Sequence, residues 1–293
     1  MSERWTVSEP GKLAFDDRIT QVRVHVIAGA VNVVAGSGPA YLEVSELSGP
    51  PLEVSLEDGR LTVTYEDLQW SDFSWKSLPH FIDRWRRKRH AVVSLAVPAE
   101  AVVEVGSVSA DVVVSGTTGR TSVHGASGDT TLVRLSGPVE ANSVSGNVQA
   151  QAVSGELKVS TVAGGFTVIE GTGNRVRGNT VSGPVTVDLD RCGAADLQLN
   201  TVSGEVAVRM PHPADAEVRA DTTSGQVSTA FDELRVTGTW GAKRVTGRLG
   251  NGSGRLRITT VSGAVALLRR PEPDAPEDGP GDGQVDFGKG ARA

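Results

Sequence analysis

A short phrase recurs along this chain: an apolar residue, a small residue, glycine, any residue, and then alternating apolar and polar residues. It is plainest at 144–148 (VSGNV), 153–157 (VSGEL), 181–185 (VSGPV), 202–206 (VSGEV) and 261–265 (VSGAV). With the small residue as anchor, successive copies follow at intervals of nine at Ser109, Thr118, Ser127, Ser136, Ser145, Ser154 and Ala163. A fixed internal period is typical of repeat architectures and constrains the fold more than any single element does.

Each copy predicts a turn followed by a short strand. Apolar residues alternate with mostly polar ones after the glycine, which is the period of a strand with one buried face. The expected inward pairs are Val112/Val114, Leu157/Val159, Phe166/Val168, Val185/Val187, Val206/Val208, Leu256/Ile258 and Val265/Leu267. We interpret the repeated glycine as a turn residue that adopts positive φ without a Cβ clash.

No copy can bury its own apolar face, so the copies must stack and share one core. Two copies, eighteen residues, form a plausible coil, and the later anchors Ser182, Ser203 and Ser224 lie twenty-one apart. The predicted fold is all-β: a single-chain β-solenoid, β-helix-like, of stacked turn–strand repeats, with one short helical insertion and a disordered C-terminal tail. A β-sandwich of hairpins is the structural rival, but it does not require the nine-residue interval.

Four segments are expected along the chain. Residues 1–65 form N-terminal β-repeat coils and a cap, with strands near Trp5 and Phe15 beginning or capping the first coil. Residues 66–90 form an aromatic and basic insertion, residues 91–270 the main β-solenoid, and residues 271–293 a tail. The tail is rich in Pro, Gly and acidic residues, so it cannot offset its ordering entropy by burial and is expected to be disordered.

The insertion is the most distinctive segment, since it holds three of the five tryptophans. Pro79 suits a helix start, and cations crowd the far end, where they favour the helix dipole. Tryptophans and a basic cluster suit an anionic membrane surface or a protein partner, whereas the plain alternative is a cap whose arginines stay in water. The candidate contact residues are Trp70, Phe73, Trp75, Phe81, Ile82, Arg84, Trp85, Arg86, Arg87, Lys88 and Arg89.

Composition narrows the function classes. The net charge of −6 over 293 residues argues against a general nucleic-acid binder, and no nucleic-acid partner is expected. The single cysteine, Cys192, excludes an intramolecular disulfide framework. The first residues lack a signal-peptide layout and no run reaches membrane-span length, so the expected location is the cytoplasm, with peripheral contact at the inner membrane face.

No motif points to catalysis or a cofactor. The five histidines are scattered, and the acids after each repeat glycine do not recur as a calcium ladder requires, so neither metal nor cofactor is expected. Neither a nucleophile elbow nor a phosphate-binding glycine loop is present, and the serines are interpreted as turn hydroxyls. The enzyme alternative is a polysaccharide-cleaving β-helix that pairs acids such as Asp188, Asp190 and Asp196.

The T-V-S-G phrases at 180–183, 201–204 and 260–263, with the other V-S-G-x-V copies, resemble the bacterial "putative adhesin" β-strand-repeat family, a domain of unknown function. The resemblance covers about residues 20–268. It implies a β-solenoid with roles at the cell envelope or in envelope-stress responses. Its motif is structural, and it brings no catalytic residues to this chain.

The sequence therefore predicts a non-enzymatic, adhesin-like interaction or scaffold protein, linked to the cell envelope through residues 66–90. Its expected partner is a protein or an anionic membrane surface. Two alternatives stay open: the carbohydrate-active enzyme, and a polymerising cytoskeletal-type scaffold that self-associates through the solenoid ends.

Overall fold

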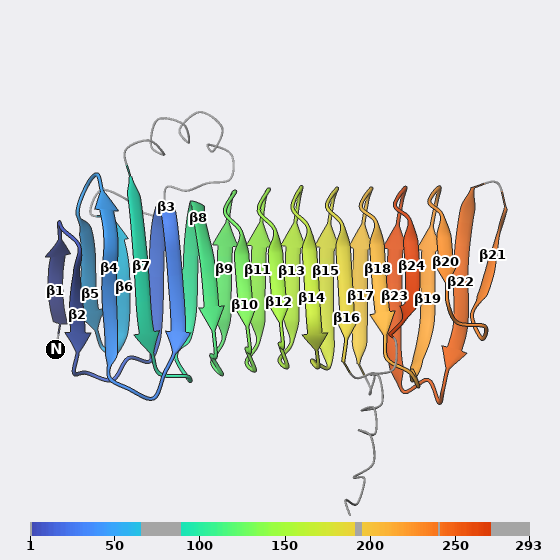
Figure 1. Ribbon diagram of the computed structural model, residues 1–293, viewed down its shortest axis with the longest axis horizontal. Coiled ribbons are helices and arrows are strands. Elements are labelled where there is room, and N and C mark those ends of the chain that lie inside the picture. The colour runs from blue at the N-terminus through green and yellow to red at the C-terminus, as the bar shows by residue number, and fades with distance from the viewer. Residues whose placement is uncertain (1, 66–88, 191–194, 240, 271–293) are drawn as a thin grey trace, which may run out of the picture.

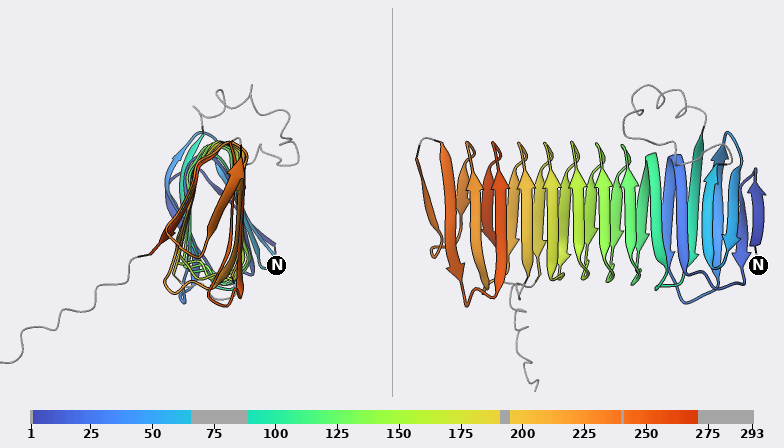
Figure 2. Two further views of the ribbon diagram at one scale, coloured as in Figure 1. Left: turned by 90° about the vertical axis from the view of Figure 1, so that its right-hand side faces the viewer. Right: turned by 180° about the vertical axis from the view of Figure 1, so that it is seen from behind.

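The computed structural model describes residues 2–65, 89–190, 195–239 and 241–270, and every regular element within these ranges is a β-strand. The strands lie side by side along the long axis of the molecule (Figure 1). Seen down that axis, they form two layers that close into a narrow, flattened outline (Figure 2). The all-β prediction is confirmed. The predicted helical insertion and disordered tail fall outside the described residues, except for residues 89 and 90.

Two long strands, β3 (Gln21–Ala35) and β8 (Val102–Ser115), contribute to both layers. The layer that we call face 1 contains, in spatial order after these strands, β9 (Thr121–Gly125), β11 (Val139–Ser143), β13 (Leu157–Thr161), β15 (Arg175–Thr180), β17 (Asp196–Thr201), β23 (Gly254–Thr260), β19 (Ala216–Thr222), β22 (Ala242–Leu249) and β21 (Arg235–Thr239). Face 2 contains β10 (Thr130–Val133), β12 (Val148–Gln151), β14 (Phe166–Gly171), β16 (Val185–Leu189), β18 (Val206–Met210), β24 (Val265–Arg269) and β20 (Val227–Thr229).

The strand pairing shows the predicted coil length. On face 2, Val112 pairs in parallel with Thr130, Thr130 with Val148, and Val148 with Phe166, each eighteen residues on. The next two steps lengthen, to Val185 and then to Val206, twenty-one residues on. Two sequence copies therefore form one coil with one strand on each face, as expected.

The inward residues of both faces share one core. Val148, Leu157 and Val185 are each 1% exposed, and Val206 is fully buried. All the predicted inward pairs are buried as well. Since burying a Val or Leu side chain contributes roughly 1.5–3 kcal/mol, this continuous core is the main source of stability for coils that have little internal contact of their own.

The repeated glycines have a different cause from the one the sequence suggested. None of the corner glycines has positive φ; a Cβ on Gly146 would instead lie 1.9 Å from the carbonyl oxygen of Gly128, one coil away. The same close approach recurs at Gly128, Gly164, Gly183, Gly204, Gly225 and Gly263. Glycine is thus required because adjacent coils meet backbone to backbone at this corner. The positive-φ interpretation is wrong for these glycines, although it holds for Gly29, Gly49 and Gly59 near the N-terminal end.

The N-terminal end departs from the parallel pattern. β4 (Ala40–Ser48) and β7 (His90–Val97) pair antiparallel, as do β5 (Leu52–Glu57) and β6 (Arg60–Tyr65). Outside them lie β1 (Ser2–Val7) and β2 (Gly11–Phe15), again antiparallel. Within residues 1–65, β3 and β6 keep the parallel pattern: Val22 of β3 pairs with Leu61 of β6, and Leu61 and Val63 are buried. The rings of Trp5 and Phe15 pack edge to face, with 5.5 Å between their centroids.

The C-terminal coils are out of sequence order. β23 lies between β17 and β19 on face 1, and β24 lies between β18 and β20 on face 2. The last described coil is therefore inserted between two earlier ones. β22 and β21 then extend face 1 as antiparallel strands beyond β19. This interleaving brings residues that are far apart in the sequence onto neighbouring strands.

Candidate functional site

The T-V-S-G corner uses its hydroxyl groups to hold the stack together. The buried Thr201 hydroxyl accepts a hydrogen bond from the Gly204 amide at 2.9 Å, and Thr180 and Thr260 do the same for Gly183 and Gly263. The Ser203 hydroxyl donates to the Val181 carbonyl of the preceding coil at 3.3 Å. The serines satisfy backbone groups, as expected, but those groups belong to the neighbouring coil.

The valines of the same corner point outward and form a ridge. Their exposed fractions are nearly equal, from 46% to 50%, at Val162, Val181, Val202 and Val261. Because the serines beside them are bonded to backbone, this ridge is apolar and one residue wide.

A row of cations crosses face 1. Paired positions on seven neighbouring strands form what we call the basic row: Lys158, Arg177, Gln198, Arg257, Arg219, Thr246 and Arg235. All five of its cations are exposed. Lys158 contacts Glu140 at 2.8 Å and Arg219 contacts Asp221 at 2.8 Å. Arg177, Arg257 and Arg235 have no ion-pair partner among the described residues.

The rows beside the basic row differ from it in charge. On one side, Arg175, Asp196, Arg255, Glu217 and Arg248 alternate in sign across successive strands. On the other side lie Asn179, Asn200 and Thr259, followed by the ion-paired Asp221 and Arg244, and the Asn200 amide donates to Asn179 at 3.0 Å. The unbalanced positive charge is therefore confined to a strip.

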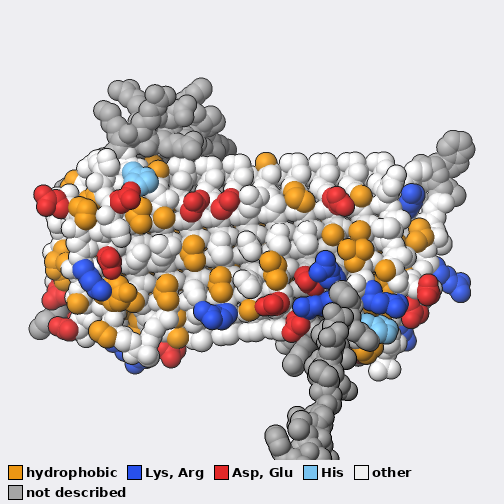
Figure 3. Space-filling view, in the orientation of Figure 1, with side chains coloured by type: hydrophobic (Ala, Val, Ile, Leu, Met, Phe, Trp, Pro, Cys, Tyr) orange, Lys and Arg blue, Asp and Glu red, His pale blue; other side chains and the backbone are white. Residues whose placement is uncertain are grey.

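The two faces also differ in total charge. The seven strands of face 1 from β13 to β21 hold ten Lys or Arg and three Asp or Glu, a net charge of +7. The seven strands of face 2 from β10 to β20 hold two Arg and two acids, a net charge of zero. Figure 3 views face 2 and shows charged side chains of both signs interspersed there. Face 1 is thus strongly basic in a chain whose total charge is −6.

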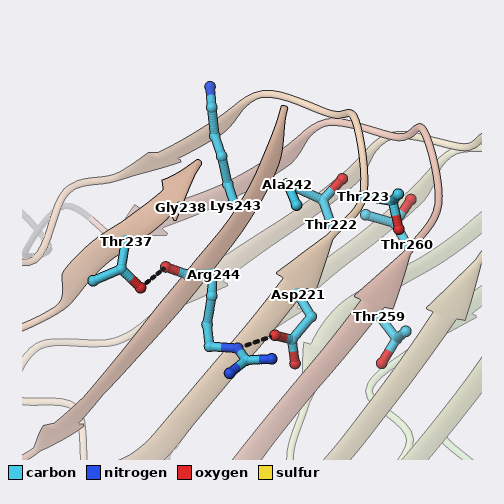
Figure 4. Close-up of a pocket in the computed structure, with 10 residues that line it drawn as sticks. All are labelled: Asp221, Thr222, Thr223, Thr237, Gly238, Ala242, Lys243, Arg244, Thr259 and Thr260. Carbon is cyan, nitrogen blue, oxygen red and sulfur yellow. Dashed lines mark hydrogen bonds and ion pairs between the residues drawn. The ribbon is translucent and has the colours of Figure 1, made fainter. Parts of the chain in front are cut away.

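A cavity of about 400 Å³ lies beside the basic row, where β22 and β21 meet β19 and β23. Its lining is rich in hydroxyls: Asp221, Thr222, Thr223, Thr237, Gly238, Ala242, Lys243, Arg244, Thr259 and Thr260 (Figure 4). Asp221 is ion-paired with both Arg219 and Arg244. Although burial opposes them, these two arginines hold the pKa of Asp221 below its ordinary value, so its carboxylate is a fixed anion and not a proton donor at neutral pH.

The acids considered for polysaccharide cleavage do not form one group, because Asp188 and Asp190 lie at β16 of face 2 and Asp196 lies on the other face. Asp188 lies on face 2 and contacts Arg209 at 3.4 Å, whereas Asp196 lies on face 1 and contacts Arg175 at 3.6 Å. Asp190 contacts Arg270 at 2.9 Å. Each of these carboxylates has an arginine partner.

Of the contact residues predicted in the insertion, only Arg89 belongs to the described residues. Its guanidinium carbon lies 5.5 Å from the centroid of the ring of Tyr65, the residue that precedes the insertion. The other ten lie outside the described ranges: Trp70, Phe73, Trp75, Phe81, Ile82, Arg84, Trp85, Arg86, Arg87 and Lys88.

His25 is a partly buried titratable group on face 1. Burial lowers its pKa from 6.5 to about 4; Glu104 opposes this shift, while Arg23 and His124 add to it. His25 is therefore neutral at physiological pH. Among the described residues, no group of three or more His, Cys, Asp or Glu side chains is placed to hold a metal ion, and no helix could span a membrane.

The family model named Toastrack DUF4097 matches residues 48–268, well over half of the chain. The chain belongs to the Toastrack DUF4097 family. The resemblance to a "putative adhesin" repeat family of unknown function, drawn from the V-S-G phrases, is confirmed, and the solenoid-like stack is the fold that it implies. No curated protein matches this Toastrack chain.

Solved structures similar to the Toastrack chain include a "putative lipid binding protein" from Parabacteroides distasonis ATCC 8503, with 13% identity, a TM-score of 0.48, and coverage of 90% of this chain and 98% of that one. A "putative adhesin" from Parabacteroides merdae ATCC 43184 has 9% identity, a TM-score of 0.38, and coverage of 90% and 97%. A "putative cell adhesion protein" from Clostridium sporogenes ATCC 15579 has 9% identity, a TM-score of 0.29, and coverage of 89% and 100%. These similarities are too low to transfer a function.

Proposed function

We propose that this chain is a non-enzymatic, adhesin-like binding scaffold of the cell envelope, which holds a partner on face 1. The observation that carries the proposal is the contrast between the net charge of +7 on seven strands of face 1 and zero on seven strands of face 2. Neighbouring strands fix these charges about 4.8 Å apart, so the surface is organised before a partner arrives.

The environment of the polar groups supports binding without turnover. The corner serines donate to backbone carbonyls, and the acids of the enzyme alternative are each paired with an arginine. A general acid needs a raised pKa, whereas the arginine pair beside Asp221 lowers it. We propose that a partner binds a face and not an end of the stack. The edge strand β20 is only three residues long, and the edge strand β1 carries Arg4, which is ion-paired with Glu53; short and charged edge strands disfavour pairing with another chain.

Co-sedimentation with isolated bacterial envelopes tests this function. We expect saturable binding that is reversed by 1 M NaCl, with no release of reducing sugar ends or free peptide over many hours. Non-saturable or absent binding contradicts the scaffold role, and time-dependent release of products contradicts its non-enzymatic character. Light scattering during the same dilution series should show no growth with concentration; growth would favour the polymerising scaffold.

A further inference from the structure

We infer that the basic row binds an acidic polysaccharide, a linear glycan that carries carboxylate or sulfate groups. This inference rests on the proposed function and names the partner of face 1. Arginine is suited to both groups, because its planar guanidinium offers two parallel N–H donors to two oxygens of a carboxylate or sulfate.

The row places like charges directly opposite each other. Lys158 pairs with Arg177 across β13 and β15, and Arg257 pairs with Arg219 across β23 and β19. Like charges at directly paired positions of a sheet are destabilising. This chain retains two such pairs, and Arg177 and Arg257 lack ion-pair partners among the described residues. An anionic ligand bound to the row would reduce the repulsion between the paired cations.

The shape of the charged strip favours a linear chain. From Lys158 to Arg235 the row crosses six strand intervals, about 29 Å at 4.8 Å each. A planar anionic surface would also meet Asp196 and Glu217 in the adjacent row, where the charges alternate. A polymer one chain wide can follow the cations and avoid these acids.

The groups beside the row suit a sugar. Exposed Asn179 and Thr259 and partly buried Asn200 line one side, where their amides and hydroxyl can bond to glycan hydroxyls. The hydroxyl-lined cavity at Thr222 and Thr223 lies on the same side of the row, where β21 and β22 meet β19 and β23, and it can hold a sugar ring. Single-stranded nucleic acids instead require aromatic platforms for their bases, and the seven strands from β13 to β21 contain no aromatic residue.

The test compares two double variants with the same change in charge. R177Q/R257Q removes two of the five cations of the row without breaking an observed ion pair. R120Q/R134Q removes two exposed arginines near the first coils, outside the row, that also have no ion-pair partner among the described residues. Circular dichroism and thermal melting check that both variants fold. R177K/R257K keeps the charge and loses only the bidentate geometry.

The probes are heparin for sulfate groups, polygalacturonate for carboxylate groups, neutral dextran, and single-stranded poly-dT matched in charge to the heparin chain. We expect heparin, polygalacturonate or both to bind at 50 mM NaCl and dextran not to bind. R177Q/R257Q should weaken binding at least tenfold and flatten the salt dependence by about two ion equivalents, while R120Q/R134Q stays within twofold. R177K/R257K should recover most of the affinity.

Equal losses in the two glutamine variants would overturn the assignment of the site, and tighter binding of poly-dT than of both glycans would overturn the assignment of the ligand. The failure of this inference is separable from the failure of the proposed function. If envelopes retain the chain but neither glycan binds, the polysaccharide inference is wrong and the scaffold role stands. If envelopes do not retain it, the scaffold role itself fails.

Discussion

A Cβ placed on Gly146 would lie 1.9 Å from the carbonyl oxygen of Gly128, eighteen residues earlier and one coil away. Real Cβ atoms essentially never approach another atom so closely, so an alanine at this corner must push two coils apart. The contact is to backbone, which cannot turn aside as a flexible side chain can. The observed spacing between coils therefore requires glycine at this corner.

Gly146→Ala should lower the free energy of unfolding by about 3 kcal/mol or more, since it strains the backbone and opens the core. Gly38→Ala is the matched control, because a Cβ there meets nothing within 4 Å. Urea unfolding should show that the control changes stability by less than about 1 kcal/mol. Equal effects at the two positions would show that adjacent coils do not meet at Gly146.

Thr201→Val should cost about 1–3 kcal/mol, because it leaves the Gly204 amide without the buried acceptor that now lies at 2.9 Å. The two side chains have nearly the same shape, so packing changes little. Thr186→Val makes the same chemical change at an exposed position of face 2 and should stay within about 0.5 kcal/mol. Thermal melting of both variants distinguishes the buried hydroxyl from a general threonine effect.

Stability should fall as the pH falls from about 6.5 to about 4. In this window the unfolded chain protonates His25 while the folded chain does not, because burial lowers the folded pKa to about 4. The linked loss is at most about 3 kcal/mol and is complete below pH 4. His25→Gln should reduce the slope of unfolding free energy against pH. An unchanged slope in the His25 variant would contradict the shift.

Gly178 and Phe166 complement each other across the core. A Cβ on Gly178 would lie 3.1 Å from Phe166 Cε1 and 3.0 Å from Leu199 Cδ2. Gly178→Val alone should cost about 1–3 kcal/mol through overpacking, and Phe166→Val about 3 kcal/mol through a cavity. The double variant should cost at least 1 kcal/mol less than the sum, about the size expected for residues in contact. Simple additivity in a double-mutant cycle would contradict the packing of these two residues.

The sequence predicted the coil well because its evidence is local. The alternation at Leu157/Val159 and Val185/Val187 identified buried positions, and the anchor intervals predicted the pairing step. The cause of the glycines was not predictable in this way, since a close approach between coils is invisible within one copy. The T-V-S-G phrases that indicated the family also mark the corner where the coils meet.

The basic row could not be assembled from the sequence. Arg257 lies beside Arg219 and two strands from Arg177 because β23 is inserted between β17 and β19. The intervals between anchors do not indicate that β23 lies out of sequence order. A partial signal was present, since Lys158 and Arg257 are the cations between inward pairs. The net charge of −6 concealed it, because acids elsewhere outnumber the cations of face 1.

The most direct test of a binding face is a footprint of arginine reactivity. The chain is modified with phenylglyoxal, with and without saturating heparin, and each arginine is quantified by mass spectrometry. We predict that Arg177, Arg257 and Arg235 lose reactivity several-fold when heparin is present, while Arg120 and Arg134 do not. Uniform protection, or protection centred on Arg209 of face 2, would contradict the account.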